Sequence, residues 1–282
     1  MTEKCENWKS ILESNLEGYN NLGDCLVCWE TAIGMQDVDG LLPSKEFITL
    51  VTKSLTKSSI SPSGFITLMR VGYYDNGSNE PIDKDTMQAD YVSANIYHFL
   101  RKWYYYYPGL CTLEAFKEIH ERLFRKTHEN AGEFRRYNIS KREWVLSGDT
   151  VKYGDCINIK SELEKCFTKA KKCSQMNQTE MVKYLSELTS SIWQVHPFSE
   201  GNTRTTACFM ISYILTVTDF PQIYDTFVDN SLYFRNALVR ACYENSQYGI
   251  KPTTRYLERF YENLLFDKKN KLDNQQLHIS YE

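Results

Sequence analysis

The sequence has no long apolar run. No stretch approaches the roughly 18–20 residues that a helix needs to cross the hydrocarbon core of a bilayer. The first ten residues, MTEKCENWKS, also lack the charged and then apolar layout of a secretory signal peptide. We therefore expect a soluble, cytoplasmic protein with no membrane partner.

The sequence also lacks an excess of charge of either sign. It holds 33 basic and 36 acidic residues, which gives a net charge of −3. Proteins that bind nucleic acids usually carry a basic excess, because their lysines and arginines displace the counterions of the phosphates. This balance argues against a dedicated nucleic-acid-binding protein, and we expect no nucleic-acid partner.

Regular cysteine spacing is absent too, although the chain has nine cysteines. One pair, Cys25 and Cys28, has the CxxC spacing that can bind zinc or carry out redox chemistry. A structural zinc site needs about four ligands, and the sequence has no second CxxC or closely spaced pair of histidines to supply them. We interpret the cysteines as reduced, mostly buried thiols.

What the sequence does contain is a series of helical patterns. A chain of 282 residues is long enough for one large domain with a small appendage. Apolar residues recur at spacings of three and four over 113–124 and 179–195, and residues 202–216 are apolar nearly all round, which is typical of a buried central helix. Short extended pieces around a Ser-Gly-Asp turn within 134–159 predict a hairpin. The predicted fold class is mostly α, with one small β-hairpin flap.

Composition divides the chain into three parts. Residues 1–80 form an N-terminal helical segment, in which Ser44 is the expected N-cap of a helix over 44–56. A loop over 74–84, with Asn-Gly, proline and acidic residues, separates this segment from a main body over 85–266. The tail, 267–282, is polar, and we expect it to be loose.

One loop between two predicted helices combines features of a reaction site. Pro197 disfavours helical dihedrals at His196, so the preceding helix must end there and the imidazole lies in a loop. Gly201, Asn202 and Thr203 then begin a long buried helix, whose first amides have no partners within the helix and carry the positive end of its dipole. The loop therefore predicts an anion-binding site in front of a base.

Two charged residues complete this loop. Glu200 is its only carboxylate and is placed to hold a divalent cation against phosphate oxygens. Arg204 lies in the first turn of the helix and adds a fixed positive charge for the same anion. Each residue alone is more often structural, but their combination within nine residues favours a functional site.

The segment from His196 to Arg204 resembles the signature of Fic-domain proteins, HPFx(D/E)GNxR. Flanking segments, among them Arg136 to Lys141 and Tyr256 to Phe260, also look like bacterial Fic sequences. The resemblance covers about 85–266. It implies a Fic-type helical bundle that acts as a bacterial protein adenylyltransferase and transfers AMP from ATP.

The resemblance also implies a role for each residue of the motif. His196 would deprotonate a Ser, Thr or Tyr hydroxyl of a target protein, which then attacks the α-phosphate of ATP. Glu200 would bind Mg²⁺ between the α- and β-phosphates. The leaving diphosphate would lie against Gly201, Asn202, Thr203 and Arg204, while Pro197 and Phe198 would be structural, with Phe198 anchoring the loop in the core.

The predicted flap has two interpretations. In the family that the chain resembles, this element pairs with an extended segment of the target, a form of β-augmentation. Its counterpart here includes Ser140, Lys141, Trp144 and Val145. From the residues alone, the flap could equally be a plain hairpin that only covers the core.

The chain departs from the family pattern in its regulatory and anion-binding positions. Many members have a second arginine where this chain has Ala207, and an inhibitory helix, (S/T)xxxE(G/N), whose glutamate pairs with that arginine. The best counterpart of the helix here begins at Thr52 and has Thr56 in place of the glutamate. We therefore expect no autoinhibition of the usual kind, although residues 44–57 could also be a plain packing helix. Thr203 replaces the usual glycine, so its dihedrals must be ordinary helical ones, because β-branched residues avoid positive φ.

Three functions stay open at this point. The first is transfer of AMP to a protein hydroxyl, including self-modification. The second is transfer of another phosphate-containing group, such as UMP or phosphocholine, and the third is a nucleotide-binding regulator with little turnover, suggested by Ala207 and Thr203. The resemblance implies ATP as substrate, Mg²⁺ as cofactor and a target protein of unknown identity as partner, and it leaves room for a homo-oligomer.

Overall fold

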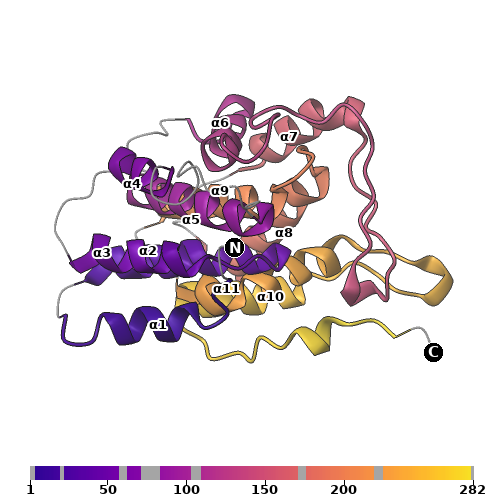
Figure 1. Cartoon of the computed structure of the whole chain (residues 1–282). Helices are drawn as coiled ribbons and strands as arrows, with labels where there is room; N and C mark the ends of the chain where they lie inside the picture. The colour runs from indigo at the N-terminus through magenta and orange to yellow at the C-terminus, as the bar shows by residue number, and fades with distance from the viewer. Residues whose placement is uncertain are drawn as a thin grey trace.

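The computed structural model describes residues 4–19, 22–56, 62–70, 83–102, 109–170, 176–218 and 225–280. Within these ranges the chain folds into α-helices and short 3-10 helices, and no β-strand is present (Figure 1). The mostly α fold class predicted from the sequence is therefore confirmed. The expected boundary between the N-terminal segment and the main body falls largely within 71–82, outside the described residues.

The first group of helices comes from the N-terminal part of the chain. It consists of α1 (Trp8–Asn15), α2 (Gly23–Gly34), the 3-10 helix η1 (Met35–Asp39), α3 (Lys45–Thr56), α4 (Pro62–Met69) and α5 (Lys84–Lys102). Their core gathers around Trp29, which stacks on Tyr97 with ring centroids 3.8 Å apart and also contacts Phe47 and Phe65. Ser44 caps α3 as predicted, because its hydroxyl accepts a hydrogen bond from the backbone N–H of Phe47 at 3.0 Å.

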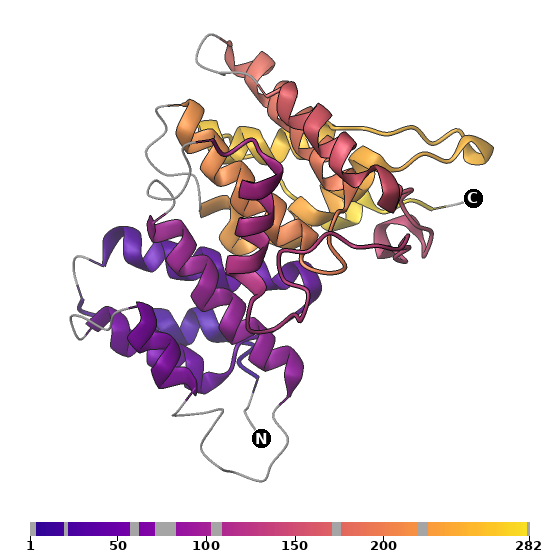
Figure 2. The same cartoon turned by 90° about the horizontal axis from the view of Figure 1, so that it is seen from above.

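The second group forms the larger core. It consists of α6 (Leu113–Phe124), α7 (Ile159–Thr168), α8 (Gln178–Val195), α9 (Asn202–Val217), α10 (Asp225–Cys242) and α11 (Arg255–Phe266), with short helices η4 (Trp144–Leu146), η5 (Cys156–Asn158), η6 (Ser246–Tyr248) and η7 (Asn274–Leu277). Figure 2 shows this group beside the N-terminal helices. Every residue of α9 from Asn202 to Ile214 is buried, so the predicted central helix is confirmed.

The two groups pack directly on each other. Helix α2 contacts both α5 and α10, and η1 contacts α9 and α10. Gly34, at the end of α2, allows this close approach: a Cβ at this position would lie 2.2 Å from the backbone oxygen of Val228. The N-terminal segment therefore reaches the start of α9, where the motif lies.

The flap predicted as a β-hairpin is an irregular loop between α6 and α7, drawn in pink along one side of the bundle (Figure 1). Its turn closes through two backbone bonds, from Glu143 N–H to Asp149 O (2.9 Å) and from Gly148 N–H to Glu143 O (3.0 Å). Further along, the backbone N–H of Lys141 donates to the Thr150 hydroxyl at 3.3 Å, and not to a carbonyl. The Thr150 side chain thus accepts the bond that a backbone carbonyl of a facing strand would accept. A ladder of backbone hydrogen bonds therefore does not form between these segments.

The tail also differs from the expectation. Residues 267–280 pack on α10 and on the flap, and the side chains of Leu277 and Ile279 are buried. The backbone N–H of Ile279 donates to Val145 O at 2.8 Å, and the ring of His278 lies 4.9 Å from that of Trp144. A polar composition did not predict this contact, because only these few apolar residues carry it.

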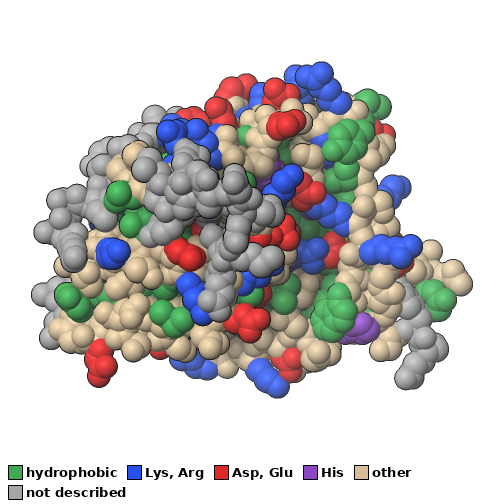
Figure 3. Space-filling view, viewed as in Figure 1, with side chains coloured by type: hydrophobic (Ala, Val, Ile, Leu, Met, Phe, Trp, Pro, Cys, Tyr) green, Lys and Arg blue, Asp and Glu red, His purple; other side chains and the backbone are tan. Residues whose placement is uncertain are grey.

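The surface and the cysteines agree with the composition. Acidic and basic side chains are interspersed over the face in Figure 3, without a field of one sign. The cysteines that the structure describes are free thiols, and each is buried or half-buried. Across the described ranges, no helix is both long and apolar enough to cross a bilayer.

Candidate active site

The motif loop, residues 196–201, joins α8 to α9. Helix α8 ends at Val195, as the sequence predicted, but His196 takes a left-handed conformation (φ 49°, ψ 58°) and not the extended one that a following proline favours. This conformation is a common way to end a helix. The backbone N–H of His196 donates to Trp193 O at 3.0 Å, which closes the last turn.

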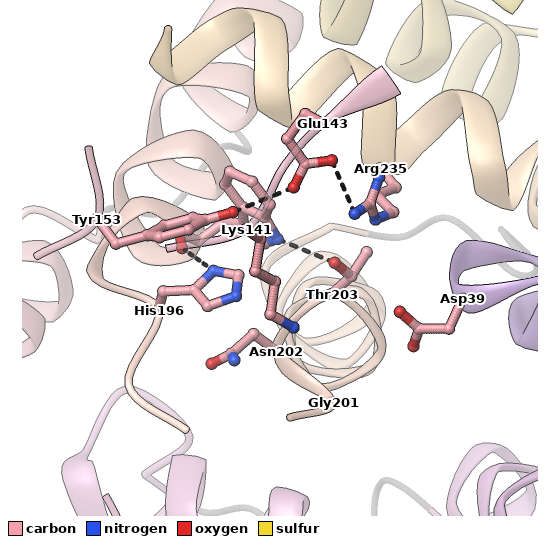
Figure 4. Close-up of a pocket in the computed structure, with 10 residues that line it drawn as sticks. Asp39, Lys141, Glu143, Tyr153, His196, Gly201, Asn202, Thr203 and Arg235 are labelled. Carbon is pink, nitrogen blue, oxygen red and sulfur yellow. Dashed lines mark hydrogen bonds and ion pairs between the residues drawn. The ribbon is translucent and has the colours of Figure 1, made fainter. Parts of the chain in front are cut away.

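A small cavity lies in front of His196. Side chains from four parts of the chain line it: Asp39 of η1; Lys141, Glu143 and Tyr153 of the flap; Trp193, His196, Gly201, Asn202 and Thr203 around the motif; and Arg235 of α10 (Figure 4). The motif therefore forms only part of the cavity wall, and the flap, the N-terminal segment and α10 form the rest.

The His196 ring is oriented for base chemistry. Its Nδ1 lies 3.3 Å from Trp193 O, and because a carbonyl oxygen can only accept, Nδ1 carries the hydrogen. The lone pair of Nε2 then faces the cavity (Figure 4). The ring packs against Tyr153 at 4.0 Å and is 3% exposed. Burial first, and then the charges of Lys141, Arg135 and Arg235, hold the pKa of His196 well below 6.5, so the imidazole is neutral.

Arg135 fixes the backbone of this loop. Its Nε donates to His196 O at 2.7 Å, one Nη donates to Val195 O at 3.2 Å, and its own backbone N–H donates to Pro197 O at 2.8 Å. Sequence reasoning missed this residue. A buried arginine (5% exposed) that satisfies loop carbonyls leaves no local pattern in the sequence.

The middle of the loop is fixed by Asn202 and His120. The backbone N–H of Phe198 donates to Asn202 Oδ1 at 2.9 Å, and Asn202 Nδ2 returns a bond to Phe198 O at 2.8 Å. His120 stacks on the buried Phe198 ring at 3.8 Å, accepts from Gly132 N–H at Nδ1 and donates from Nε2 to Glu200 O at 3.1 Å. The oxygen and the nitrogen of the Asn202 side-chain amide are thus both used inside the loop. Backbone N–H groups are left as the donors for an anion.

Gly201 can be replaced by no other residue without strain. It has φ 72°, and a Cβ there would lie 2.4 Å from the ring of Phe124. It also offers no side chain to cap α9, so the first N–H groups of this helix stay available at the cavity. Thr203 follows with negative φ, as predicted, and its hydroxyl accepts from Trp193 Nε1 at 3.0 Å.

Arg204 lies in the first turn of α9, as the sequence predicted, and its side chain is held by the N-terminal segment. Its guanidinium is 1% exposed and points toward η1, where Nη1 donates to Gln36 Oε1 at 2.7 Å and Nη2 to Asp39 Oδ2 at 2.8 Å. It also stacks on Phe124. The guanidinium is not itself part of the cavity lining, but its partner Asp39 is, so Arg204 lies directly behind the cavity wall that Asp39 forms.

Glu200 forms an ion pair with the flap. Lys141 Nζ lies 3.2 Å from its Oε2, and the Glu200 side chain is 59% exposed. No group of three or more metal-binding side chains occurs among the described residues. A single carboxylate still suits Mg²⁺, which is often bound by one or two carboxylates together with substrate phosphates. Glu200 therefore fits the predicted role once Lys141 moves away.

A second ion pair lies across the cavity from His196. Glu143 is 1% exposed and its Oε2 lies 2.8 Å from Arg235 Nη2, while the hydroxyl of Tyr153 donates to its Oε1 at 3.2 Å. Burial raises the pKa of Glu143, and Arg235 opposes this shift. The alternation of Lys141 and Glu143 in an extended segment could have indicated that both face the same side. Nothing in the sequence indicated Arg235.

The other flap residues lie away from the cavity. The side chain of Ser140 donates to Thr150 Oγ1 at 3.2 Å, and Val145 is fully buried. Trp144 is 52% exposed, so its ring is open to a partner. Of the four predicted docking residues, the structure thus brings Lys141 alone to the cavity.

The segment expected to correspond to the inhibitory helix does not reach the motif arginine. Helix α3 packs against α1, α2 and α4, and the hydroxyls of Thr52 and Thr56 bond to carbonyls of their own helix. Residue 57 lies outside the described residues. The element that reaches Arg204 is η1, while Ala207 is buried within α9.

Comparison with known proteins finds a family similarity in the middle of the chain. Residues 110–214, which include the whole motif, match the model of the Fic/DOC family. This match covers less than half of the chain. No curated protein shows a significant match to the chain.

Comparison with solved structures gives two similar chains. A Fic family protein from Desulfovibrio desulfuricans G20 superposes with a TM-score of 0.50 at 11% identity, over 93% of this chain and 72% of the other. BepC, a VirB-translocated effector protein from Bartonella tribocorum whose structure holds AMPPNP, gives a TM-score of 0.44 at 17% identity, over 70% of this chain and 97% of that chain. The first superposition extends beyond residues 110–214 into the N-terminal helices.

Proposed function

We propose that this protein contains a Fic domain and transfers AMP from ATP to a Ser, Thr or Tyr hydroxyl of a protein, its own chain included. The observation that carries the proposal is the neutral imidazole of His196, whose Nε2 faces a cavity at the start of α9. A base and unpaired backbone donors at one cavity suit the attack of a hydroxyl on a phosphate.

The reaction balances with the groups present. The hydroxyl oxygen forms a bond to the α-phosphorus, and its proton goes to Nε2 of His196. The bond from the α-phosphorus to the bridging oxygen breaks, and pyrophosphate leaves with the electron pair. The backbone N–H groups of Gly201, Asn202 and Thr203 would stabilise the charge on the leaving group.

Glu200 would hold Mg²⁺ in this reaction. Its carboxylate reaches the cavity side of the loop, where Lys141 now pairs with it. The metal would neutralise phosphate charge. The backbone of Glu200 stays in place whether or not the metal is bound, because the His120 imidazole holds its carbonyl.

A target protein would approach from the flap side. The exposed ring of Trp144 offers an apolar contact there, and the irregular backbone of the flap leaves carbonyl and N–H groups outside any ladder. An extended peptide can pair with such groups. We include this docking role in the proposal.

A second candidate function is a nucleotide-binding regulator with little turnover. The observation that favours it is the position of Arg204, which is held by Asp39 and Gln36, together with the absence of an arginine at Ala207. Such a protein would bind ATP without transferring any part of it.

Incubation with α-labelled ATP, GTP, UTP or CTP separates these candidates. We expect covalent label from ATP in the presence of Mg²⁺, and a loss of about 10²-fold or more in His196→Ala, with ATP binding retained. His128→Ala is the control, since this histidine lies outside the cavity. Label at the wild-type rate in His196→Ala would refute the base assignment. Binding without label would favour the regulator, and label from another nucleotide would change the donor.

A further inference from the structure

The cavity holds two cationic side chains, Lys141 and Arg235. Arg204 lies outside its lining, with both terminal nitrogens bonded to Gln36 and Asp39. An anion in front of His196 therefore meets cations of the flap and of α10 directly, while Asp39 stands between it and the arginine of the motif.

The two cations differ in how firmly they are held. Arg235 pairs with Glu143, which is 1% exposed, so removing this partner would leave a buried carboxylate uncompensated. Lys141 pairs with Glu200, whose side chain is 59% exposed and can return to water. Pairs of this open kind contribute little to stability. Lys141 is therefore the cation that an incoming anion can recruit.

The flap backbone directs Lys141 into the cavity. Its N–H bonds to Thr150, and Lys141 and Glu143 face the cavity, whereas Arg142 between them is exposed. In Figure 4 the Lys141 side chain runs between His196 and Asn202, with its ammonium group at the start of α9. Its charge is also one cause of the low pKa of His196, which agrees with this proximity.

We propose that Lys141 is the phosphate-binding cation of this site. On nucleotide binding its ammonium leaves Glu200 and donates to a non-bridging oxygen of the α-phosphate. This inference rests on the proposed function. The inference adds to the proposed function, because it gives the flap a role at the phosphate besides docking of the target.

The exchange balances in charge. The phosphate replaces Glu200 as the partner of Lys141, and the freed carboxylate is available to Mg²⁺. Lys141 keeps its proton throughout, and the proton of the attacking hydroxyl still goes to His196. Negative charge that develops on the α-phosphate is met by a charge-assisted hydrogen bond.

The first test is ATP affinity measured by calorimetry, with Mg²⁺ and with EDTA. We expect Lys141→Met to weaken ATP binding about tenfold or more in both conditions and to leave adenosine binding unchanged. Lys141→Arg should restore most of the ATP affinity. Arg142→Met is the matched control, because it removes the adjacent exposed charge of the same flap, and its affinity should stay within about twofold. Equal ATP affinity in Lys141→Met and wild type would overturn the proposal.

The second test uses the ion pair itself. In EDTA, Glu200→Gln should bind ATP more tightly than wild type, because Lys141 no longer has to leave a carboxylate. The same substitution in a Lys141→Met background should have no such effect, so the double-mutant cycle should show coupling. Additive effects would contradict the proposed exchange of partners, and a purely structural role of Lys141 predicts no gain in affinity.

Failure of this inference can be told apart from failure of the proposed function. If His196→Ala abolishes labelling while Lys141→Met labels and binds ATP as wild type does, only the role of Lys141 is wrong. If His196→Ala labels normally, the proposed reaction is wrong, whatever the ATP affinity of Lys141→Met.

Discussion

The motif loop (196–201) and the flap (137–153) meet at one cavity but are held by different means. In the motif loop, His196, Pro197 and Phe198 are buried, and bonds from Arg135, His120 and Asn202 fix the backbone. The flap has backbone bonds within its turn at 143–149, hydroxyl contacts at Thr150, and the tail packed against its tip. The start of the motif loop is buried throughout, whereas the flap alternates between buried side chains such as Val145 and exposed ones such as Trp144.

This difference indicates that the motif loop and the flap have different functions at the site. The base and the anion-binding amides depend on the buried loop, so their geometry is preserved when the flap shifts. The flap contributes charge and contact surface, through Lys141, Glu143 and Trp144. Damage to the motif loop should therefore reduce stability and reaction rate together, while damage to the flap should mainly change binding.

The largest expected effect comes from Phe198→Ala. The ring is fully buried against His120 and Phe116, so its loss should lower the free energy of unfolding by about 3–5 kcal/mol. Trp144→Ala, in the exposed part of the flap, should cost much less. Urea unfolding of both variants measures this, and equal losses would remove the contrast between the two regions.

Gly201→Ala should follow closely. Positive φ and a clash with Phe124 together should cost about 2–5 kcal/mol and abolish labelling. Gly249→Ala is the matched control, because Gly249 has a similar φ of 65° but open space around its Cα. If both variants lose the same stability, the close contact at Phe124 contributes nothing.

Stability should also fall as the pH falls below about 6.5. Burial lowers the pKa of His120 to about 3 and that of His196 well below its usual value, so the unfolded chain binds protons that the folded chain does not. Each such histidine should reduce the free energy of unfolding by about 1.4 kcal/mol per pH unit. Urea unfolding between pH 7 and 5 checks this slope.

His120→Gln is the informative variant for this pH dependence. It removes one buried titratable group. The free energy of unfolding should therefore depend less steeply on pH below about 6.5, by the contribution of one histidine. An unchanged slope would mean that other groups cause the loss of stability in acid. At pH 7 and above, where both rings are neutral in either state, the pH dependence from these residues should vanish.

The smallest effect is expected for Thr150→Val in the flap. The change removes the acceptor of the Lys141 N–H and should cost about 0.5–1.5 kcal/mol. Because this bond orients Lys141, ATP affinity should fall more clearly than stability. Thermal unfolding measures the change in stability, and calorimetry on the same sample measures the change in ATP affinity. A large loss of stability with normal ATP binding would argue against a role of this bond in orienting Lys141.

Several features could be predicted because they depend on neighbours in sequence. The end of α8 at Val195 follows from Pro197, the start of α9 from Gly201, and the helical dihedral of Thr203 from its branched side chain. The periodic apolar residues of α6, α8 and α9 likewise predicted the core. In each case the cause lies within a few residues along the chain.

The sequence by itself determined the motif, the mostly helical fold and the position of the base, because backbone sterics and hydrophobic periodicity act locally. Only the tertiary structure decided which charges enter the cavity. Asp39 comes from η1, Lys141 from the flap and Arg235 from α10. The direction of Arg204 depended on Gln36 and Asp39, more than 160 residues away in sequence. A buried guanidinium takes the partners that packing brings to it, and no local pattern specifies these partners.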